Sequence, residues 1–480
     1  MKKIFFIFLF FIISFKNAYS LIKVDITRGN LDPLPIAISP LHVDSKSEKL
    51  SLFDTDKLGE EISKVIEQNF RSTGLFNPLK KDSFVQKPEI AHLKPRFEDW
   101  RLIKAQALIT GKVLVTNKKL KVEFRLWDTI ASKEMLALSF TTTPSNWRRV
   151  AHIISDKVYE RLTGEGGYFD TRIIYVAETG PKGQRIKKLG LMDQDGYNIK
   201  YLTLGNELVL TPRFNPTNQL VTYMSYFKNM PRVYLLDIET GIQEVVGSFP
   251  GMTFAPRFSP DGKKIIMSFA KDGNSDIYSM DIESRVVEQI TKHPSIDTSP
   301  SYSPDGTQLA FNSNRDGNIE IYIVNVDGTG TRRLTNHPGI DTSPTWSPLG
   351  HQIAFTSDRS GSPQVYVVDV DGTGLRRITF ESYCDRPTWS PAPYNEIAYA
   401  SRTGPGFDIK VVDLATNEVR QLTFGQGSNE SPSYSPNGRH LAFSSSRGNG
   451  DKQIYLIGRD GRGLKRLTNN GNNEMPSWSR

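Results

Sequence analysis

The sequence is nearly free of cysteine and carries none of the familiar catalytic motifs. Its 480 residues include a single cysteine, which excludes an intramolecular disulfide framework and a cysteine-rich zinc or iron–sulfur site. A nucleophile elbow (G-x-S-x-G), a P-loop, a G-x-G-x-x-G after a strand and an H-E-x-x-H are all missing. After the N-terminus, no apolar run reaches the roughly 18 residues of a membrane span. These absences argue against the common hydrolases, nucleotide-dependent enzymes and membrane proteins.

The charge balance is only mildly basic. The chain has 60 lysines and arginines against 52 aspartates and glutamates, which gives a formal net charge of +8. A charge of this size can steer a chain toward acidic partners, but it does not by itself indicate nucleic-acid binding. We therefore expect no nucleic-acid partner.

The N-terminus has the three-part layout of a secretory signal peptide. Two lysines follow the first methionine, an apolar run covers residues 4–15, and Ala18 and Ser20 are the small residues expected before a cleavage site. Residues 1–20 are thus predicted to be removed, with an uncleaved N-terminal anchor as the alternative. The mature chain then begins near Leu21, works outside the cytoplasm and has no membrane span. Its scarcity of cysteine suits an oxidising compartment.

A short motif recurs through the last two thirds of the chain. It reads proline, any residue, an aromatic residue, serine or asparagine, and usually a second proline. Its copies follow one another every 43 to 45 residues and begin at Pro212, Pro256, Pro300, Pro344, Pro387, Pro432 and Pro476. A period of this length is typical of a β-propeller blade of four short strands. Seven copies predict seven blades.

Each period divides into four predicted strands. In the copy that starts at Pro300, the motif is the inner strand, and a Pro-Asp-Gly turn leads to an apolar second strand over residues 308–311. A third strand over 319–323 and a short fourth strand over 333–335 follow. Before the fourth strand of the next copy, residues 369–374 resemble part of a calcium loop but lack the full ligand set, so they predict a hairpin turn.

The two ends of the repeat region are complementary. Residues 171–203 offer three strands with no inner strand before them, whereas residues 476–480 are an inner strand with nothing after it. We expect the C-terminal strand to complete the blade begun near residue 171, because this closure leaves no open sheet edge. The propeller is therefore predicted over residues 171–480.

The region before the propeller has no repeat and is predicted to be an α/β domain over residues 21–165. Apolar residues at helical spacing predict helices over 56–72, ended by a glycine at position 74, and over 146–162. Alternating patterns predict strands over 23–27, 35–39, 106–115 and 121–127.

One pair of histidines falls at equivalent positions of neighbouring copies. His293 and His337 precede adjacent inner strands and are followed four residues later by Asp297 and Asp341. Such residues can form a metal site at the mouth of a propeller. Alternatively, the repeats simply duplicate their loop residues. The lone Cys384 has no neighbour that marks it as an activated thiol, and we interpret it as incidental.

Basic residues also repeat. Arg315, Arg359, Arg402 and Arg447 follow the second strand of their copies and are expected on one rim of the propeller. Each arginine either pairs with an aspartate of its own blade or contributes to a basic ring that receives an acidic protein surface. The sequence leaves both interpretations open.

The loops that enter the inner strands are a second candidate site. They carry small polar or acidic residues just before the motif proline, among them Thr298, Thr342, Asp385 and Glu430. The ends of these loops are expected to crowd around the central channel. There they either accept a partner loop or cap the strands, and the sequence favours neither.

The mature chain as a whole resembles the TolB family, the periplasmic component of the Tol–Pal envelope system. The resemblance covers the signal peptide, the α/β region and the propeller repeats, and the junction is its most specific part. Residues 160–164 (E-R-L-T-G) and 171–176 (T-R-I-I-Y-V) are similar to the family's helix-to-propeller link. Residues 72–78 (S-T-G-L-F-N-P) and the Trp-Arg pair at 147–148 also resemble the family.

The resemblance implies a monomeric, non-enzymatic scaffold without a cofactor or metal. In the family such a scaffold supports outer-membrane integrity and envelope constriction during cell division. The family's propeller binds the lipoprotein Pal at its mouth, and the residues implicated there fall on Met252, Ala255 and Thr298. Characterised members have a histidine at the position of Met252. Other outer-membrane or peptidoglycan-associated proteins are further candidate partners.

The resemblance also implies a second partner, TolA, which the family binds through its extreme N-terminal segment, here residues 21–27. That segment can bind as an added strand, a mode that uses main-chain hydrogen bonds and tolerates sequence changes. Pal competes by withdrawing the segment, so the family acts as a switch between two partners. The residues expected to contact TolA are Leu21, Ile22, Lys23, Val24, Asp25 and Ile26.

One feature departs from the family, because characterised members have six blades and this sequence has seven copies of the motif. A seventh blade is expected to widen the channel. Two other functions stay as alternatives. A metal-dependent polysaccharide lyase would use the histidine pair at the propeller mouth, and a peptidase accessory propeller would need a hydrolase domain on another chain.

Overall fold

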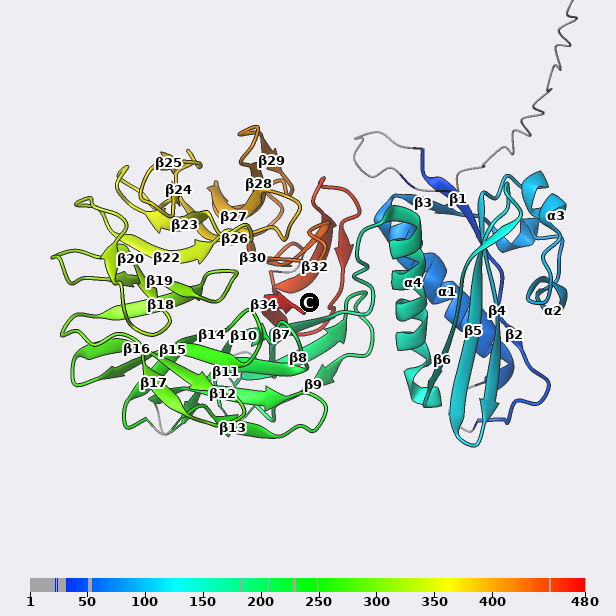
Figure 1. The fold of residues 1–480 in the computed structure, drawn as a ribbon, viewed down its shortest axis with the longest axis horizontal. Helices are drawn as coiled ribbons and strands as arrows, with labels where there is room; N and C mark the ends of the chain where they lie inside the picture. Colours follow the sequence, from blue (N-terminus) through cyan, green and yellow to red (C-terminus); the bar gives the residue numbers. More distant parts are fainter. Residues whose placement is uncertain are drawn as a thin grey trace, which may run out of the picture. The chain divides into compact units, whose positions relative to one another are not determined.

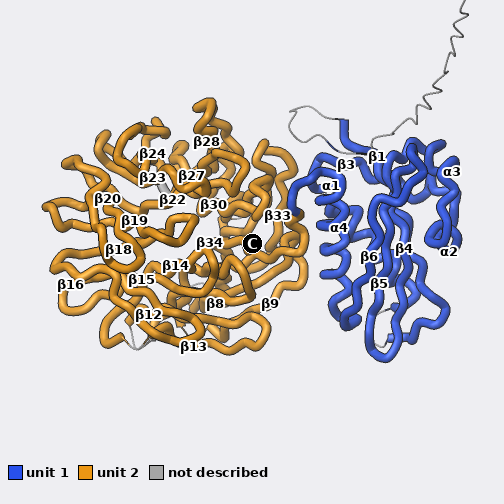
Figure 2. The backbone as a smooth tube through the Cα atoms, in the orientation of Figure 1, with its two compact units in different colours: residues 1–166 blue, residues 167–480 orange. Residues whose placement is uncertain are grey.

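The computed structural model describes residues 22, 24, 32–50, 54–181, 184–205, 207–227, 230–247, 249–448 and 450–479. The chain divides into two compact units, residues 1–166 and residues 167–480, which are coloured separately in Figure 2. Within the described ranges, no helix is both long enough and apolar enough to cross a membrane.

Unit 1 is an α/β fold built on one sheet with strand order β3-β1-β4-β5-β6, with β2 pairing to β4. The two long helices, α1 and α4, pack against each other. The strands are β1 (Leu34–Ile38), β2 (His42–Val43), β3 (Phe76–Pro78), β4 (Ala107–Thr116), β5 (Lys119–Asp128) and β6 (Lys133–Thr142), and the helices are α1 (Leu58–Thr73), α2 (Pro88–Ala91), α3 (Phe97–Leu102) and α4 (Trp147–Thr163).

The sequence pattern explains the first long helix. Helix α1 buries Ile62, Val65, Ile66 and Phe70 as one apolar stripe. Gly74 ends the helix with φ of 68°, a left-handed conformation that costs glycine little. The helices expected over 56–72 and 146–162 are thus observed, each shifted by one or two residues. Strand β6 was not predicted, because most of its side chains are exposed and show no alternation.

Unit 2 is a seven-bladed propeller, which confirms the count of motif copies. Six blades follow one another in the chain, each an antiparallel sheet of four consecutive strands (Figure 1). They are β10–β13 (Val209–Phe214, Leu220–Phe227, Met230–Asp237, Gln243–Val245), β14–β17 (Met252–Phe258, Lys264–Lys271, Asn274–Asp281, Val287–Gln289), β18–β21 (Asp297–Tyr302, Gln308–Ser313, Glu320–Asn325, Arg332–Arg333), β22–β25 (Asp341–Trp346, Gln352–Ser357, Gln364–Asp369, Arg376–Arg377), β26–β29 (Cys384–Trp389, Glu396–Thr403, Gly406–Asp413, Val419–Gln421) and β30–β33 (Asn429–Tyr434, His440–Ser445, Gln453–Gly458, Lys465–Arg466).

The seventh blade joins the two ends of the propeller. The C-terminal strand β34 (Asn472–Trp478) pairs antiparallel with β7 (Arg172–Thr179), followed by β8 (Ile186–Asp193) and β9 (Lys200–Tyr201). The indole of Trp478 donates a hydrogen bond to Thr171 Oγ1 at 2.8 Å. Each innermost strand contacts the next around the whole ring, including β34 with both β10 and β30. The expected closure is therefore confirmed.

Neighbouring blades bury apolar side chains between their sheets. In one such layer, Ile321 and Ile323 of one blade pack with Trp346, Ile353 and Phe355 of the next. All five side chains are at most 7% exposed. A blade cannot bury its apolar faces alone, so each blade depends on both of its neighbours.

The closure predicts a large effect of Trp478→Ala on stability. Trp478 is 6% exposed and holds the last strand to the first, so we expect the free energy of unfolding to fall by about 3–5 kcal/mol in urea titrations. Phe424→Ala is the control, because Phe424 is 72% exposed. Equal stability of the two variants would contradict closure by β34.

Candidate functional site

All seven inner strands begin at one end of the propeller with the same backbone irregularity, a β-bulge next to the motif proline. In β18 the bulge follows Thr298, and Ser299 has φ of 56°. A left-handed conformation costs a residue other than glycine about 1 kcal/mol. Among the residues that the structure describes, six blades share it at this position, with φ between 48° and 56°, at Thr211, Ala255, Ser299, Ser343, Ser431 and Met475. The bulge therefore shapes the mouth of the channel in the same way blade after blade.

The structure brings the predicted mouth residues together. Thr298, Thr342, Asp385 and Glu430 each occupy the second residue of the repeat's inner strand, directly before the bulge, in four consecutive blades. The side chain of Asp385 lies outside the described atoms. In the preceding blade, Ala255 occupies the left-handed position of the bulge. The sixth residue, Met252, begins that same inner strand and is 43% exposed.

The polar character of this mouth changes around the ring. Thr298 accepts a hydrogen bond from the amide of Asn312 at 2.7 Å. The Glu430 carboxylate instead receives the ammonium group of Lys452 at 3.0 Å and the hydroxyl of Ser428 at 2.7 Å. Glu474, at the same position of the next blade, is held by Lys187 at 2.7 Å. Some blades thus present hydroxyl groups and others present carboxylates.

Glu474 is a mouth residue that sequence reasoning missed. It precedes Pro476 by two residues, as Thr298 precedes Pro300 and Glu430 precedes Pro432. The repeat spacing alone was therefore a sufficient signal.

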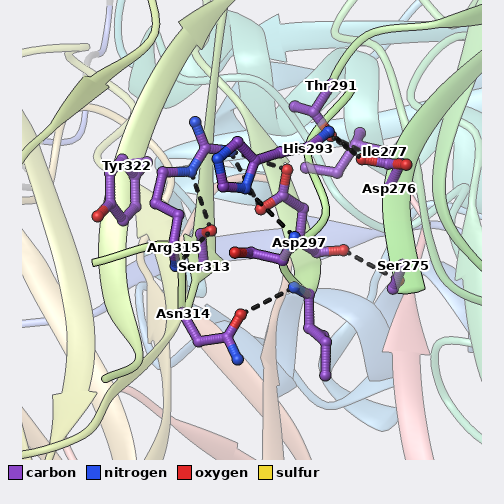
Figure 3. Close-up of polar contacts among 12 residues, drawn as sticks. Ser275, Asp276, Ile277, Thr291, His293, Asp297, Ser313, Asn314, Arg315 and Tyr322 are labelled. Carbon is purple, nitrogen blue, oxygen red and sulfur yellow. Dashed lines mark hydrogen bonds and ion pairs between the residues drawn. The ribbon is translucent and has the colours of Figure 1, made fainter. Parts of the chain in front are cut away.

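Three of the four rim arginines are structural. Arg315 donates to both carboxylate oxygens of Asp297, at 3.1 and 2.9 Å, and to Ser313 Oγ at 3.1 Å, while its guanidinium lies over the ring of Tyr322 (Figure 3). In the next blade, Arg359 repeats this arrangement with Asp341 at 2.5 Å. The side chains of Arg315 and Arg359 are only 14% and 9% exposed.

The third structural arginine has a neutral partner. Arg447 donates to Asn429 Oδ1 at 3.0 Å, in the place of the aspartates. The prediction of an open basic ring is therefore wrong for Arg315, Arg359 and Arg447, because their guanidinium groups donate hydrogen bonds within their own blades. Pairing with an aspartate of the same blade is correct for the first two.

Arg402 does not occupy the same position as the other three. In each of these four blades, the first residue of the inner strand pairs with a serine on the second strand. The other three arginines come two residues after that serine, whereas Arg402 comes directly after its serine, Ser401. Strand β27 continues through Arg402, whose side chain is exposed. Since side chains alternate along a strand, the offset of one residue sends it to the other face. The predicted equivalence of Arg402 with the other rim arginines is therefore wrong.

Cys384 takes the place that aspartate has in two other blades. It is the first residue of β26, is fully buried, and its Sγ lies 3.2 Å from Glu381 Oε2. Burial and the nearby Glu381 carboxylate raise the pKa of the thiol to about 12. The side chain is thus unreactive and belongs to the core at the start of a strand.

The two equivalent histidines stabilise their own loops. The Nδ1 of His293 accepts the backbone N–H of Ser295 at 3.2 Å, and the Nδ1 of His337 accepts that of Gly339 at 2.9 Å. The backbone N–H groups of the two histidines donate to acids on the third strand of the preceding blade, Asp276 at 3.1 Å and Glu320 at 2.6 Å.

These acids, which the sequence reasoning did not single out, belong to a buried polar seam between blades. Burial raises the pKa of Asp276 above its usual value. It does the same for Asp341, which begins the inner strand β22 beside this seam. The contacts of Asp276, Thr291 and His293 beside those of Asp297 and Arg315 are drawn in Figure 3. Buried polar groups are retained at low cost only when they are hydrogen-bonded, so the seam fixes how one blade meets the next.

Two residues of the predicted N-terminal segment are described, and both contact unit 1. The backbone N–H of Ile22 donates to Asp128 Oδ2 at 3.2 Å, and that of Val24 donates to the carbonyl of Leu162 at 2.7 Å. Val24 is buried. The other predicted TolA contacts, Leu21, Lys23, Asp25 and Ile26, lie outside the described residues.

Comparison with known proteins matches both units to one family. The model described as the TolB beta propeller domain matches residues 159–322 and 314–480, and that described as the TolB amino-terminal domain matches residues 22–135. The chain belongs to the TolB family. A curated relative, the Tol-Pal system protein TolB of Pelagibacter ubique (strain HTCC1062), is 70% identical over 252 residues. That match covers 52% of this chain and 56% of the relative.

Solved structures agree with the family. TolB from Acinetobacter baumannii matches with a TM-score of 0.64 and 25% identity, over 93% of this chain and 97% of that chain. A prolyl endopeptidase structure matches with a TM-score of 0.50 and 13% identity, over 62% of this chain and 48% of that chain. The second likeness reflects the propeller fold alone.

The arginine contacts yield a paired prediction for this TolB-family chain. Arg359→Ala leaves the buried Asp341 without its cation, so the free energy of unfolding is expected to fall by about 3–5 kcal/mol. Arg402→Ala removes an exposed side chain and is expected to change it by less than about 0.5 kcal/mol. Chemical denaturation of both variants measures the difference, and a large loss from Arg402→Ala would contradict the assignment.

Proposed function

We propose that this chain is a non-enzymatic periplasmic scaffold of the Tol–Pal system that binds the lipoprotein Pal at the propeller mouth. The observation that carries the proposal is the position of Ala255, Thr298, Thr342 and Glu430 at the same end of four inner strands. Repeated bulges hold their backbone, and buried contacts immobilise the nearby arginines. A preformed rim of this kind spares a partner much of the entropic cost of ordering loops.

The proposed second partner is TolA, bound through residues 21–27. The contacts of Ile22 and Val24 with Asp128 and Leu162 support a docked form of this segment. Both contacts use backbone N–H groups, which an added strand on another protein satisfies equally well. Docking on unit 1 and binding to TolA then compete for the same main-chain groups, and the scaffold can exchange partners. In this role it supports outer-membrane integrity and envelope constriction during division.

Thr298→Arg tests the Pal site. The larger charged side chain obstructs the mouth, so we expect the affinity of residues 21–480 for the soluble domain of the organism's own Pal to fall at least about tenfold in calorimetry. Thr416→Arg is the matched control, since Thr416 lies in the exposed turn between β28 and β29, at the other end of its blade.

The outcomes are distinguishable. Loss of affinity in Thr298→Arg alone supports the mouth as the Pal site, whereas equal binding by both variants moves the site elsewhere. A folded wild-type protein that binds no Pal removes the proposed function, and metal analysis would then test the lyase alternative.

Deletion of residues 21–27 tests the second partner. We expect TolA binding to be lost, because the strand that pairs with it is gone, while the folded propeller still binds Pal. Pull-down with the two soluble domains measures both effects in parallel. Retained TolA binding by the deletion variant would rule out this segment as the TolA site.

A further inference from the structure

A second ring of residues follows the bulge of each inner strand, two or three residues below the mouth. It is defined by the first ladder pair after the bulge, which joins Ser301 of β18 to Ala310 of β19. The members of this ring are Arg213, Arg257, Ser301, Thr345, Thr388, Ser433 and Ser477. Five blades thus place a small hydroxyl residue here, and two adjacent blades place an arginine.

The environment of Arg257 is unusual for a cation. Burial, together with repulsion from the guanidinium of Arg213, lowers the pKa of Arg257 to about 9. Among the described residues, its side chain donates one hydrogen bond, to the carbonyl of Pro256 at 2.9 Å. In the described part of the chain, no carboxylate forms an ion pair or hydrogen bond with it. The residue nevertheless keeps part of its surface open to solvent.

Three other recessed arginines of the propeller each have a carboxylate partner, and Arg447 has the amide oxygen of Asn429. Arg315 and Arg359 each have an aspartate of their own blade. Arg459 contacts the carboxylate of Glu396. Placing a cation in a recessed position without an anion is costly, and that cost is offset when an anion binds. Guanidinium groups recognise planar carboxylates and tetrahedral phosphates through two parallel hydrogen bonds.

We propose that Arg257, with Arg213 on the adjacent inner strand, forms a binding site for an oxyanion within the propeller, and that the ligand is a carboxylate or a phosphate group. The hydroxyl residues of the same ring, such as Ser301 on the neighbouring blade, supply further donors. The site is separate from the mouth residues before the bulge, and the proposal does not rest on the proposed function. A free anion and an acidic group carried on a larger ligand share this chemistry.

Calorimetry with inorganic phosphate and with succinate tests the site in phosphate-free buffer of low ionic strength. The full mature chain is expected to bind at least one of the two saturably, with one site. Arg257→Met is expected to weaken that binding about ten- to hundredfold, the worth of a charge-assisted hydrogen bond. Arg462→Met, the same charge change at a side chain that is 83% exposed, is expected to leave the affinity unchanged.

The preferred anion distinguishes the sources, since binding of phosphate alone indicates a phosphate ligand and binding of succinate alone a carboxylate. Failure of both anions to bind, or equal binding by Arg257→Met and the wild type, would overturn the proposal.

Thermal melting separates a binding role of Arg257 from a structural one. In anion-free buffer Arg257→Met is expected to melt at the wild-type temperature or above it, because a recessed cation has been removed. A clear fall in melting temperature would assign Arg257 to the fold instead.

Discussion

The pairing of β34 with β7 is the constraint on which the rest of the propeller depends. These strands come from the two ends of unit 2, and their ladder converts a row of six blades into a ring of seven. Without it, two sheet faces would lose their apolar neighbour and β7 would be left as an unpaired edge. The ring also places the starts of seven inner strands at one end, and only this arrangement turns a repeated loop into a mouth.

Within that ring, buried polar groups determine how precisely one blade meets the next. An acid that begins the third strand of one blade accepts N–H groups of the loop leading to the next, as Glu320 does with His337. The first inner-strand residue then receives the arginine of its own blade, as Asp341 receives Arg359. These contacts explain why residues that look suited to a partner or a metal are occupied within the fold. The residues directly before the bulge line the mouth, and Arg213 and Arg257 follow the bulge on two adjacent inner strands.

Much of the architecture followed from the sequence, because the spacing of the motif records the chain length of one blade. That spacing was enough to predict seven blades and their closure by residues 476–480. Spacing does not report which way a side chain turns, and the rim arginines show the consequence. The spacing makes Arg315 and Arg359 candidates for a basic surface, yet both are buried. It also makes Arg402 their equivalent, yet Arg402 differs by one strand position. The motif does not mark Arg213 and Arg257, because both occupy its variable position between the proline and the aromatic residue.

Hydrogen exchange of the native protein tests the closed ring most directly. If β34 and β7 hold the propeller together, the amides of their shared ladder should exchange as slowly as those of the strand pair β19 and β20, through one common unfolding event. Exchange of the β34 amides several orders of magnitude faster than those of β19 would mean that the ring opens at this blade while the others stay folded. That result would contradict closure as the source of the propeller's stability.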